Sequence, residues 1–128
     1  MSGVPITALY AGILGLLAVF LANQVLYARL RTGKVPDWLP DTVMRVQANF
    51  VENVPLALLL LLILELQSAP AQVLHLLGAG LVACRLLHAF GMSRNPGANY
   101  PRLIGAQGTF LLIGTMGAAA VYGYVIGT

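Results

Sequence analysis

Residues 45–55 read RVQANFVENVP, and they place several hydrogen-bonding side chains directly before the apolar run LALLLLLIL. In a helix, with about 100° between successive residues, Asn49 lies about 40° and Glu52 about 20° from Arg45, so that the three share one face. Asn53 lies at the edge of this face and Gln47 on the other side. Because an ionised carboxylate is costly inside a membrane, we expect Glu52 to face protein or water and to have a partner.

A second polar group lies at the end of a later apolar segment, in the motif RLLHAFG. Arg85 and His88 share a helical face there with Met92. Arg85 lies about 9 Å below Gly91, and Glu52 about 10 Å below Arg45, from a rise of about 1.5 Å per residue. Because these depths match, the sequence predicts an ion pair between Arg85 and Glu52.

The basic residues near these motifs outnumber the acidic ones. Five arginines are predicted to gather around Asn49, Glu52 and His88; they are Arg29, Arg31, Arg45, Arg85 and Arg102. This positive excess favours an anionic ligand with several carboxylates, held by charge-assisted hydrogen bonds. Two simpler interpretations stay open. Arg45, Asn49 and Glu52 could only hold helices together, and the residues Arg29, Arg31, Lys34 and Arg94 could only set membrane topology.

The elements that must position these residues are membrane-spanning helices. Of the 128 residues, 59% are hydrophobic and 9% charged, with a mean hydropathy of +0.84, whereas a soluble domain carries about a quarter charged residues. We expect an all-α integral membrane four-helix bundle, a single domain over 1–128. Gly- and Pro-containing breaks divide it into four spans, at about 4–28, 43–66, 69–90 and 103–127.

The seven basic residues all fall toward one side of these spans, in or beside the first and third loops. The positive-inside rule therefore places these two loops in the cytoplasm and both termini on the other side, the periplasm of a bacterium. We expect an inner-membrane location. A net charge of +3 is too small and scattered for a nucleic-acid-binding protein.

No functional site is predicted at the cysteine, at His75 or at the glycines of the fourth span. The single cysteine, Cys84, excludes an internal disulfide. We predict no metal site, because His75 and His88 lie far apart without further ligands, and we expect His75 to be packed or capped. The glycines of the fourth span are expected to permit close helix packing; they are Gly105, Gly108, Gly114 and Gly117. A transporter is not favoured, because no pair of broken helices is evident.

The two motifs together resemble the MAPEG family, the membrane-associated proteins in eicosanoid and glutathione metabolism. RVQANFVENVP resembles the family's second-span signature R-x-Q-x-N-x-x-E-x-x-P, and RLLHAFG resembles its third-span motif R-x-x-H. The resemblance covers nearly the whole chain and is greatest to the small bacterial inner-membrane branch. It implies a homotrimer that binds glutathione between neighbouring subunits, at sites that open to the cytoplasm.

The resemblance also assigns roles to residues. It implies that glutathione is held by Arg45, Gln47, Asn49 and Glu52, with Arg85, His88 and a basic residue at the end of the first span, Arg29 or Arg31. Arg102 would stabilise the thiolate, the catalytic role. The thiolate could attack a lipophilic electrophile that arrives from the bilayer lipids, or reduce a lipid hydroperoxide. This predicts a glutathione-dependent transferase or peroxidase that needs glutathione as co-substrate and no metal.

Two positions depart from the family pattern. Family enzymes often carry tyrosines where this chain has Asn53 and Met92, which predicts weaker glutathione binding or a different thiol. The alternative is a non-catalytic membrane protein of the same fold that binds an anionic lipid or another thiol metabolite. Arg102 discriminates between the two, because catalysis needs a cation at the thiol, whereas a lipid site would tolerate lysine.

Overall fold

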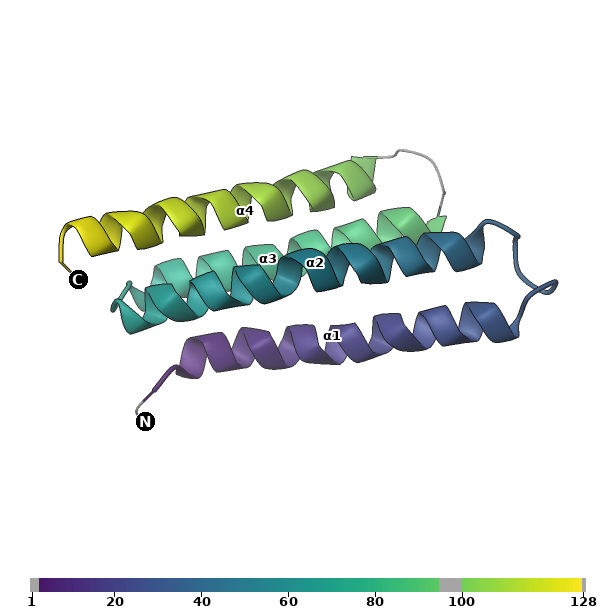
Figure 1. Ribbon diagram of the computed structural model, residues 1–128, viewed down its shortest axis with the longest axis horizontal. Coiled ribbons are helices and arrows are strands. Elements are labelled where there is room, and N and C mark those ends of the chain that lie inside the picture. The colour runs from purple at the N-terminus through teal and green to yellow at the C-terminus, as the bar shows by residue number, and fades with distance from the viewer. Residues whose placement is uncertain (1–2, 95–99, 128) are drawn as a thin grey trace.

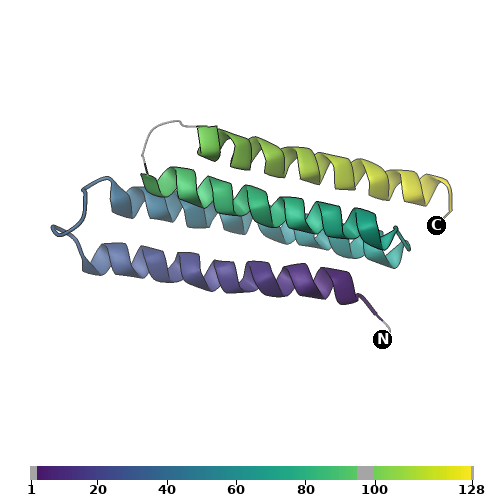
Figure 2. The ribbon, with the colours of Figure 1, turned by 180° about the vertical axis from the view of Figure 1, so that it is seen from behind.

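The structure, a computed structural model, describes residues 3–94 and 100–127, and the side chains of all of these except 92–94. Met92 and Arg94 therefore lie outside the described side chains. The described residues form four helices in up-and-down order: α1 (Pro5–Leu30), α2 (Leu39–Leu66), α3 (Ala71–Arg94) and α4 (Tyr100–Val125). Figures 1 and 2 show them aligned along one axis. The four spans predicted from the sequence coincide with these helices within a few residues.

Helix α2 begins earlier than the predicted span, at Leu39 instead of about residue 43. Proline in the first helical turn costs nothing, because its missing N–H would have no intrahelical partner there. Pro40 occupies this turn together with Asp41, whose negative charge is favourable at a helix N-terminus. At its other end α2 runs without interruption through Pro55 to Leu66, and Ser68, at φ 65°, makes the turn into α3.

The helices do not form a square bundle. Helices α2 and α3 lie in the middle, α1 packs against both, and α4 packs against both from the opposite side (Figures 1 and 2). Within the described ranges α1 and α4 do not pack against each other. The face of α2 that points into the core repeats every three or four residues, as the burial of Val46, Phe50, Val54, Ala57 and Leu61 shows.

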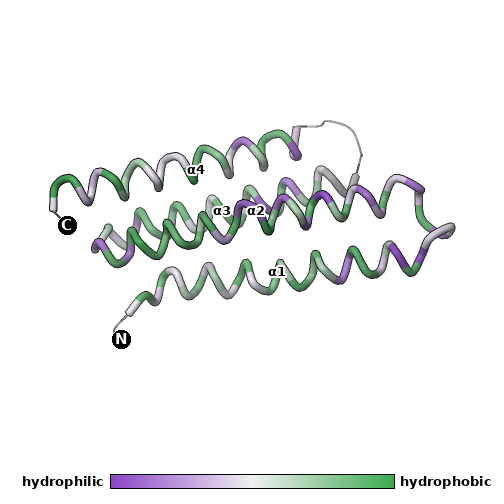
Figure 3. Tube along the Cα trace, in the orientation of Figure 1, coloured by the Kyte–Doolittle hydropathy of each residue, from purple (hydrophilic) through white to green (hydrophobic). Residues whose placement is uncertain are grey.

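The outer surface is apolar, as a membrane requires. Large hydrophobic side chains are exposed on every helix, among them Leu16, Leu56, Leu76 and Leu111. All four helices are long and apolar enough to cross a membrane. Figure 3 shows hydrophilic positions gathered in the half of α2 nearest its start and near the loop between α1 and α2. The structure thus agrees with a protein that spans the membrane four times.

The end of the bundle that holds the α2–α3 turn is called the turn end here. Side chains on its helices bond to neighbouring helices. The Glu65 carboxylate accepts hydrogen bonds from the backbone N–H groups of Ile6 (3.0 Å) and Thr7 (2.8 Å), at the start of α1. These N–H groups have no partner inside their own helix, and lipid offers none. Glu65 of α2 therefore caps α1.

Two further contacts join helices at the turn end. The Tyr10 hydroxyl lies 2.9 Å from Nδ1 of His75 and 3.2 Å from the His75 carbonyl oxygen, and links α1 to α3. Gln67 Nε2 donates to the Ala120 carbonyl oxygen of α4 at 3.2 Å. The Tyr10 ring packs so tightly on Gly78 that a Cβ there would overlap it. All four helices are thus bonded to a neighbour at this end.

Candidate functional site

The opposite end, where α1 joins α2, is called the basic end here. A ridge of polar side chains runs along α2 from it; this polar ridge consists of Arg45, Asn49 and Glu52. Arg45 and Glu52 are exposed, and Asn49 is half-buried. The Oδ1 atom of Asn49 is buried but has no hydrogen-bond partner among the described residues. The predicted common face of these three residues is therefore an outer face of the chain.

A shallow hollow of about 330 Å³ lies beside the ridge, lined by Asp41, Met44, Arg45 and Ala48. Arg29, near the end of α1, reaches this side of α2, because its Nη2 atom lies 3.4 Å from the Met44 sulfur. The structure therefore brings one predicted site residue of α1 next to the ridge. Arg29 and Arg45 can both present guanidinium groups to an anion there.

A second polar cluster is buried inside the bundle; this inner cluster consists of Arg85, His88 and Thr109. Arg85 is only 2% exposed and His88 only 4%. Arg85 Nη1 donates to Thr109 Oγ1 at 3.3 Å, and Nη2 lies 3.4 Å from His88 Nδ1. The guanidinium carbon lies 5.8 Å from the centroid of the Phe50 ring. Arg85 Nε has no hydrogen-bond partner among the described residues.

The predicted ion pair between Arg85 and Glu52 is wrong within the chain. Arg85 contacts Phe50, which lies about 140° around α2 from Arg45, whereas Glu52 lies about 20° from it. Depth along the helix matches, but the two side chains lie on opposite sides of α2. The inner cluster and the polar ridge are therefore separate features of one chain.

The two remaining predicted site residues are Gln47 on α2 and Arg102 on α4. Gln47 is half-buried and lies about 200° around α2 from Arg45, on the bundle side. Arg102 is half-buried in the first turn of α4, three residues before Gly105, which packs directly on the His88 backbone. Asn53, at the position where the family often has tyrosine, bonds locally, because its Nδ2 donates to the Asn49 carbonyl oxygen at 2.8 Å.

Other expectations from the sequence have mixed outcomes. His75 is exposed but hydrogen-bonded to Tyr10, which confirms the second of the two expectations, a capped residue. Gly105 and Gly108 permit close packing, because a Cβ at either would lie 2.5 Å from an atom of Cys84 in α3. By contrast, a Cβ at Gly114 or Gly117 would meet nothing within 4 Å, so that packing role is absent there within the described chain.

Sequence reasoning missed Thr109 as the partner of Arg85. The Thr109 hydroxyl donates to the Gly105 carbonyl oxygen at 2.8 Å, which leaves its lone pairs free to accept from the guanidinium. The sequence did not indicate Thr109, because a lone threonine in an apolar span belongs to no recognisable motif. One signal was present: Gly105 and Thr109 are spaced four residues apart and so share a face.

The fold and these two clusters define a four-span membrane protein with arginines both buried inside its bundle and exposed beside it. The sequence pattern of the MAPEG family matches residues 7–122, and the chain belongs to this family.

One relative is similar over most of its length. The inner membrane protein YecN of Escherichia coli is 29% identical over 92 residues, which cover 67% of this chain and 69% of YecN, and the YecN sequences of strains K12 and CFT073 match equally. No solved structure gives a significant match. YecN is named an inner membrane protein, and the four candidate spans of this chain agree with a membrane location.

Proposed function

We propose that the protein is a glutathione-dependent membrane transferase or peroxidase that acts on a lipophilic electrophile or a lipid hydroperoxide. The observation that carries this proposal is the polar ridge. Arg45 and Glu52 are exposed on a membrane-spanning helix, and neither bonds to another helix of the described chain. Because exposed charges in a membrane span are costly, such a pair favours a ligand or a partner that covers it.

Glutathione matches the chemistry of this ridge. It carries two carboxylates and one amine, so it requires several cations and one anion. Arg45 and Arg29 can each bind a carboxylate, and Glu52 can accept hydrogen bonds from the amine. Asn49 Oδ1, which is buried without a partner in the described part of the chain, can accept a hydrogen bond from a peptide N–H.

Arg102 is the proposed catalytic residue, because a guanidinium beside the thiol stabilises the reactive thiolate. Arg102 lies one helical turn before Gly105, which packs directly on the His88 backbone, so Arg102 stands near the inner cluster. The ridge lies on the other side of α2. We therefore propose that glutathione binds between neighbouring chains of a homotrimer, in contact with the ridge of one chain and Arg102 of the other.

The proposed orientation brings this site to the glutathione of the cytoplasm. Arg29, Arg31 and Lys34 lie in or beside the loop between α1 and α2, and the turn end has no lysine or arginine within the described residues. By the positive-inside rule the basic end then faces the cytoplasm, with both termini in the periplasm.

Calorimetric titration of the detergent-solubilised protein with glutathione tests the proposal. We expect saturable binding that weakens at least tenfold in Arg45→Ala, because a hydrogen bond to a charged group contributes about 1.5–3 kcal/mol. Lys34→Ala removes the same charge from the loop and should leave binding unchanged. If glutathione binds, the ultraviolet absorbance of its thiolate should fall in Arg102→Gln.

An absence of saturable binding up to millimolar glutathione would contradict the proposal. The non-catalytic alternative, a protein of the same fold that binds another anion, would then replace it.

A further inference from the structure

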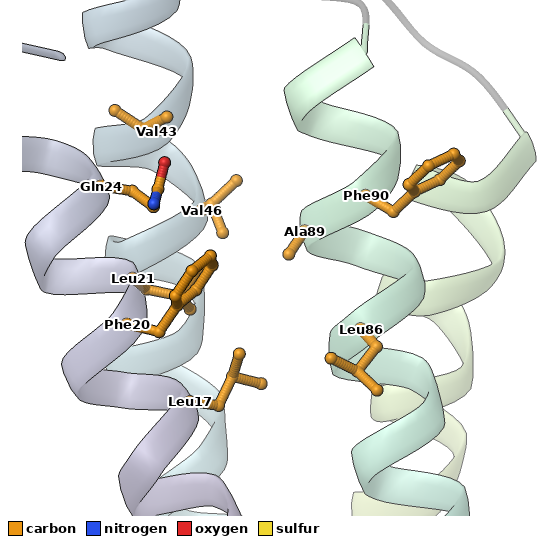
Figure 4. Close-up of a pocket in the computed structure, with 9 residues that line it drawn as sticks. All are labelled: Leu17, Phe20, Leu21, Gln24, Val43, Val46, Leu86, Ala89 and Phe90. Atoms are coloured by element: carbon orange, nitrogen blue, oxygen red, sulfur yellow. The ribbon is translucent and has the colours of Figure 1, made fainter. Parts of the chain in front are cut away.

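An apolar groove opens between α1 and α3 near the basic end, with α2 as its floor (Figure 4). Its volume is about 310 Å³. Leu17 and Leu21 line it from α1, Leu86 and Ala89 from α3, and Val46 from α2. The groove lies on a different side of α2 from the polar ridge, because Val46 and Val43, which line it, lie about 100° and 160° around the helix from Arg45. No residue assigned to glutathione lines it.

The face of α1 that lines the groove continues beyond it to a cationic residue. Gln24, which points into the groove in Figure 4, is the polar residue of its lining. Tyr27 and Arg31 continue the same face of α1 beyond Gln24, because successive residues turn by about 100°. The Arg31 guanidinium carbon lies 5.2 Å from the centroid of the Tyr27 ring. Arg31 is thus held about 10 Å above Gln24, given a rise of about 1.5 Å per residue.

We infer that this groove binds one acyl chain of an anionic membrane phospholipid, with the phosphate of the head group at Arg31. An amphiphile with an apolar tail and an anionic head matches the gradient from Leu17 through Gln24 to Arg31. Inside a membrane an unfilled apolar groove loses dispersion contacts, and acyl chains are the apolar groups available to fill it.

The size of the groove argues against a helix of a second chain as its occupant. A helix with its side chains is about 10–12 Å wide, which is too wide for a cavity of about 310 Å³ between two packed helices. A single unbranched chain fits this space.

A second groove provides an internal comparison at the turn end. It has a similar volume, about 360 Å³, and a similarly apolar lining that includes Gln67, Ala119 and Tyr122. The described residues at that end include no lysine or arginine. This groove can therefore accept an apolar chain but has no cation to select an anionic head group.

Native mass spectrometry of the solubilised protein with dioleoyl phosphatidylglycerol or dioleoyl phosphatidylcholine tests the inference. We expect about fivefold greater retention of the anionic lipid, which is the effect of about one basic residue at a membrane surface. Arg31→Gln should abolish this preference. Arg29→Gln is the matched control, because Arg29 lies about 160° around α1 from Arg31 and points to α2 instead.

A second matched pair tests the groove itself. Ala89→Phe fills it and should lower retention of both lipids at least fivefold, whereas Ala119→Phe fills the turn-end groove and should leave the preference for phosphatidylglycerol unchanged. Equal effects of Arg29→Gln and Arg31→Gln would overturn the inference, because they would indicate diffuse attraction to the basic end. Unchanged retention of both lipids in Ala89→Phe would also overturn the inference. This holds even if the substitution changes the oligomeric state of the protein.

A crosslinking experiment on the unsubstituted protein covers the case in which Ala89→Phe fails to fold. A phosphatidylglycerol with a photoreactive diazirine in its acyl chain should label peptides of α1 and α3 that contain Leu17 or Leu86. Labelling confined to α4 would contradict the inference. Because lipid retention is measured without glutathione, and glutathione binding is tested separately with Arg45→Ala, neither result depends on the proposed enzymatic function.

Discussion

The two ends of the bundle use polar side chains in opposite ways. At the turn end the polar groups of Glu65, Tyr10 and Gln67 bond across helices. At the basic end Arg45 and Glu52 are exposed, and the buried Arg85 bonds to Thr109 but has no partner for its Nε atom among the described residues. The turn end thus contributes stability, whereas the basic end has polar groups that a ligand could still satisfy.

This difference has an energetic basis. A hydrogen bond to a charged group contributes about 1.5–3 kcal/mol, and a buried polar group without a partner costs about 1–3 kcal/mol. The folded chain is therefore stable only if the hydrogen bonds at the turn end offset the cost of the unpartnered polar groups at the basic end. Substitutions at the two ends should therefore separate stability from ligand binding.

The largest expected effect on stability comes from the cap of α1. Glu65→Ala removes two charge-assisted hydrogen bonds and should lower the free energy of unfolding by about 3 kcal/mol. Unfolding in mixed detergent micelles measures this change. Glu52→Ala removes the same side chain from the same helix at an exposed position, where a charge in a membrane span is costly, and should not lower the unfolding free energy. Equal losses of unfolding free energy in the two variants would contradict the proposed difference between the two ends.

The next effect concerns the packing of α1 on α3. A Cβ at Gly78 would overlap the Tyr10 ring, so Gly78→Ala should destabilise the protein by about 2 kcal/mol through overpacking. Gly80 is the control, because its Cβ would lie 3.6 Å from a Leu112 methyl group, an ordinary contact. Thermal unfolding should show no loss of stability for Gly80→Ala. A neutral Gly78→Ala would mean that the two helices separate easily.

A smaller effect isolates the hydrogen bond at the same place. Tyr10→Phe keeps the ring but removes the hydroxyl that bonds to His75, which should cost about 1 kcal/mol. Tyr27→Phe, on the exposed part of the same helix, should leave the unfolding midpoint unchanged. If both variants behave alike, the Tyr10 hydroxyl adds nothing to the stability of the turn end.

The smallest expected change comes from the inner cluster, and it has the opposite sign. Arg85→Met replaces a buried cation that lacks a carboxylate partner with an unbranched apolar chain of similar length. Such a replacement is often neutral or stabilising, so the unfolding free energy should stay the same or rise by less than about 1 kcal/mol. A loss as large as that of Glu65→Ala would show that Arg85 supports the fold itself.

The sequence was sufficient to predict the four helices, because long apolar segments divided by Gly and Pro leave a membrane chain few alternatives. It also predicted that Arg45, Asn49 and Glu52 share a face. It did not predict which way that face points. Matching depths suggested the pair of Arg85 and Glu52, but depth does not fix rotation about the helix axis.

The rotation of α2 could have been predicted from its apolar residues. Val46, Phe50, Val54, Ala57 and Leu61 are spaced at three and four residues and form the buried face. The apolar run after Pro55 is hydrophobic on all sides and obscures this pattern. The cap at Glu65 was missed for another reason, since a contact between residues about sixty apart has no local signal.

The cap of α1 also orders events during synthesis. The N–H groups of Ile6 and Thr7 emerge from the ribosome before Glu65, which lies 59 and 58 residues further along the chain. Until Glu65 has been made, these groups cannot bond to it. We therefore expect α1 and α2 to settle in the membrane together, as one hairpin.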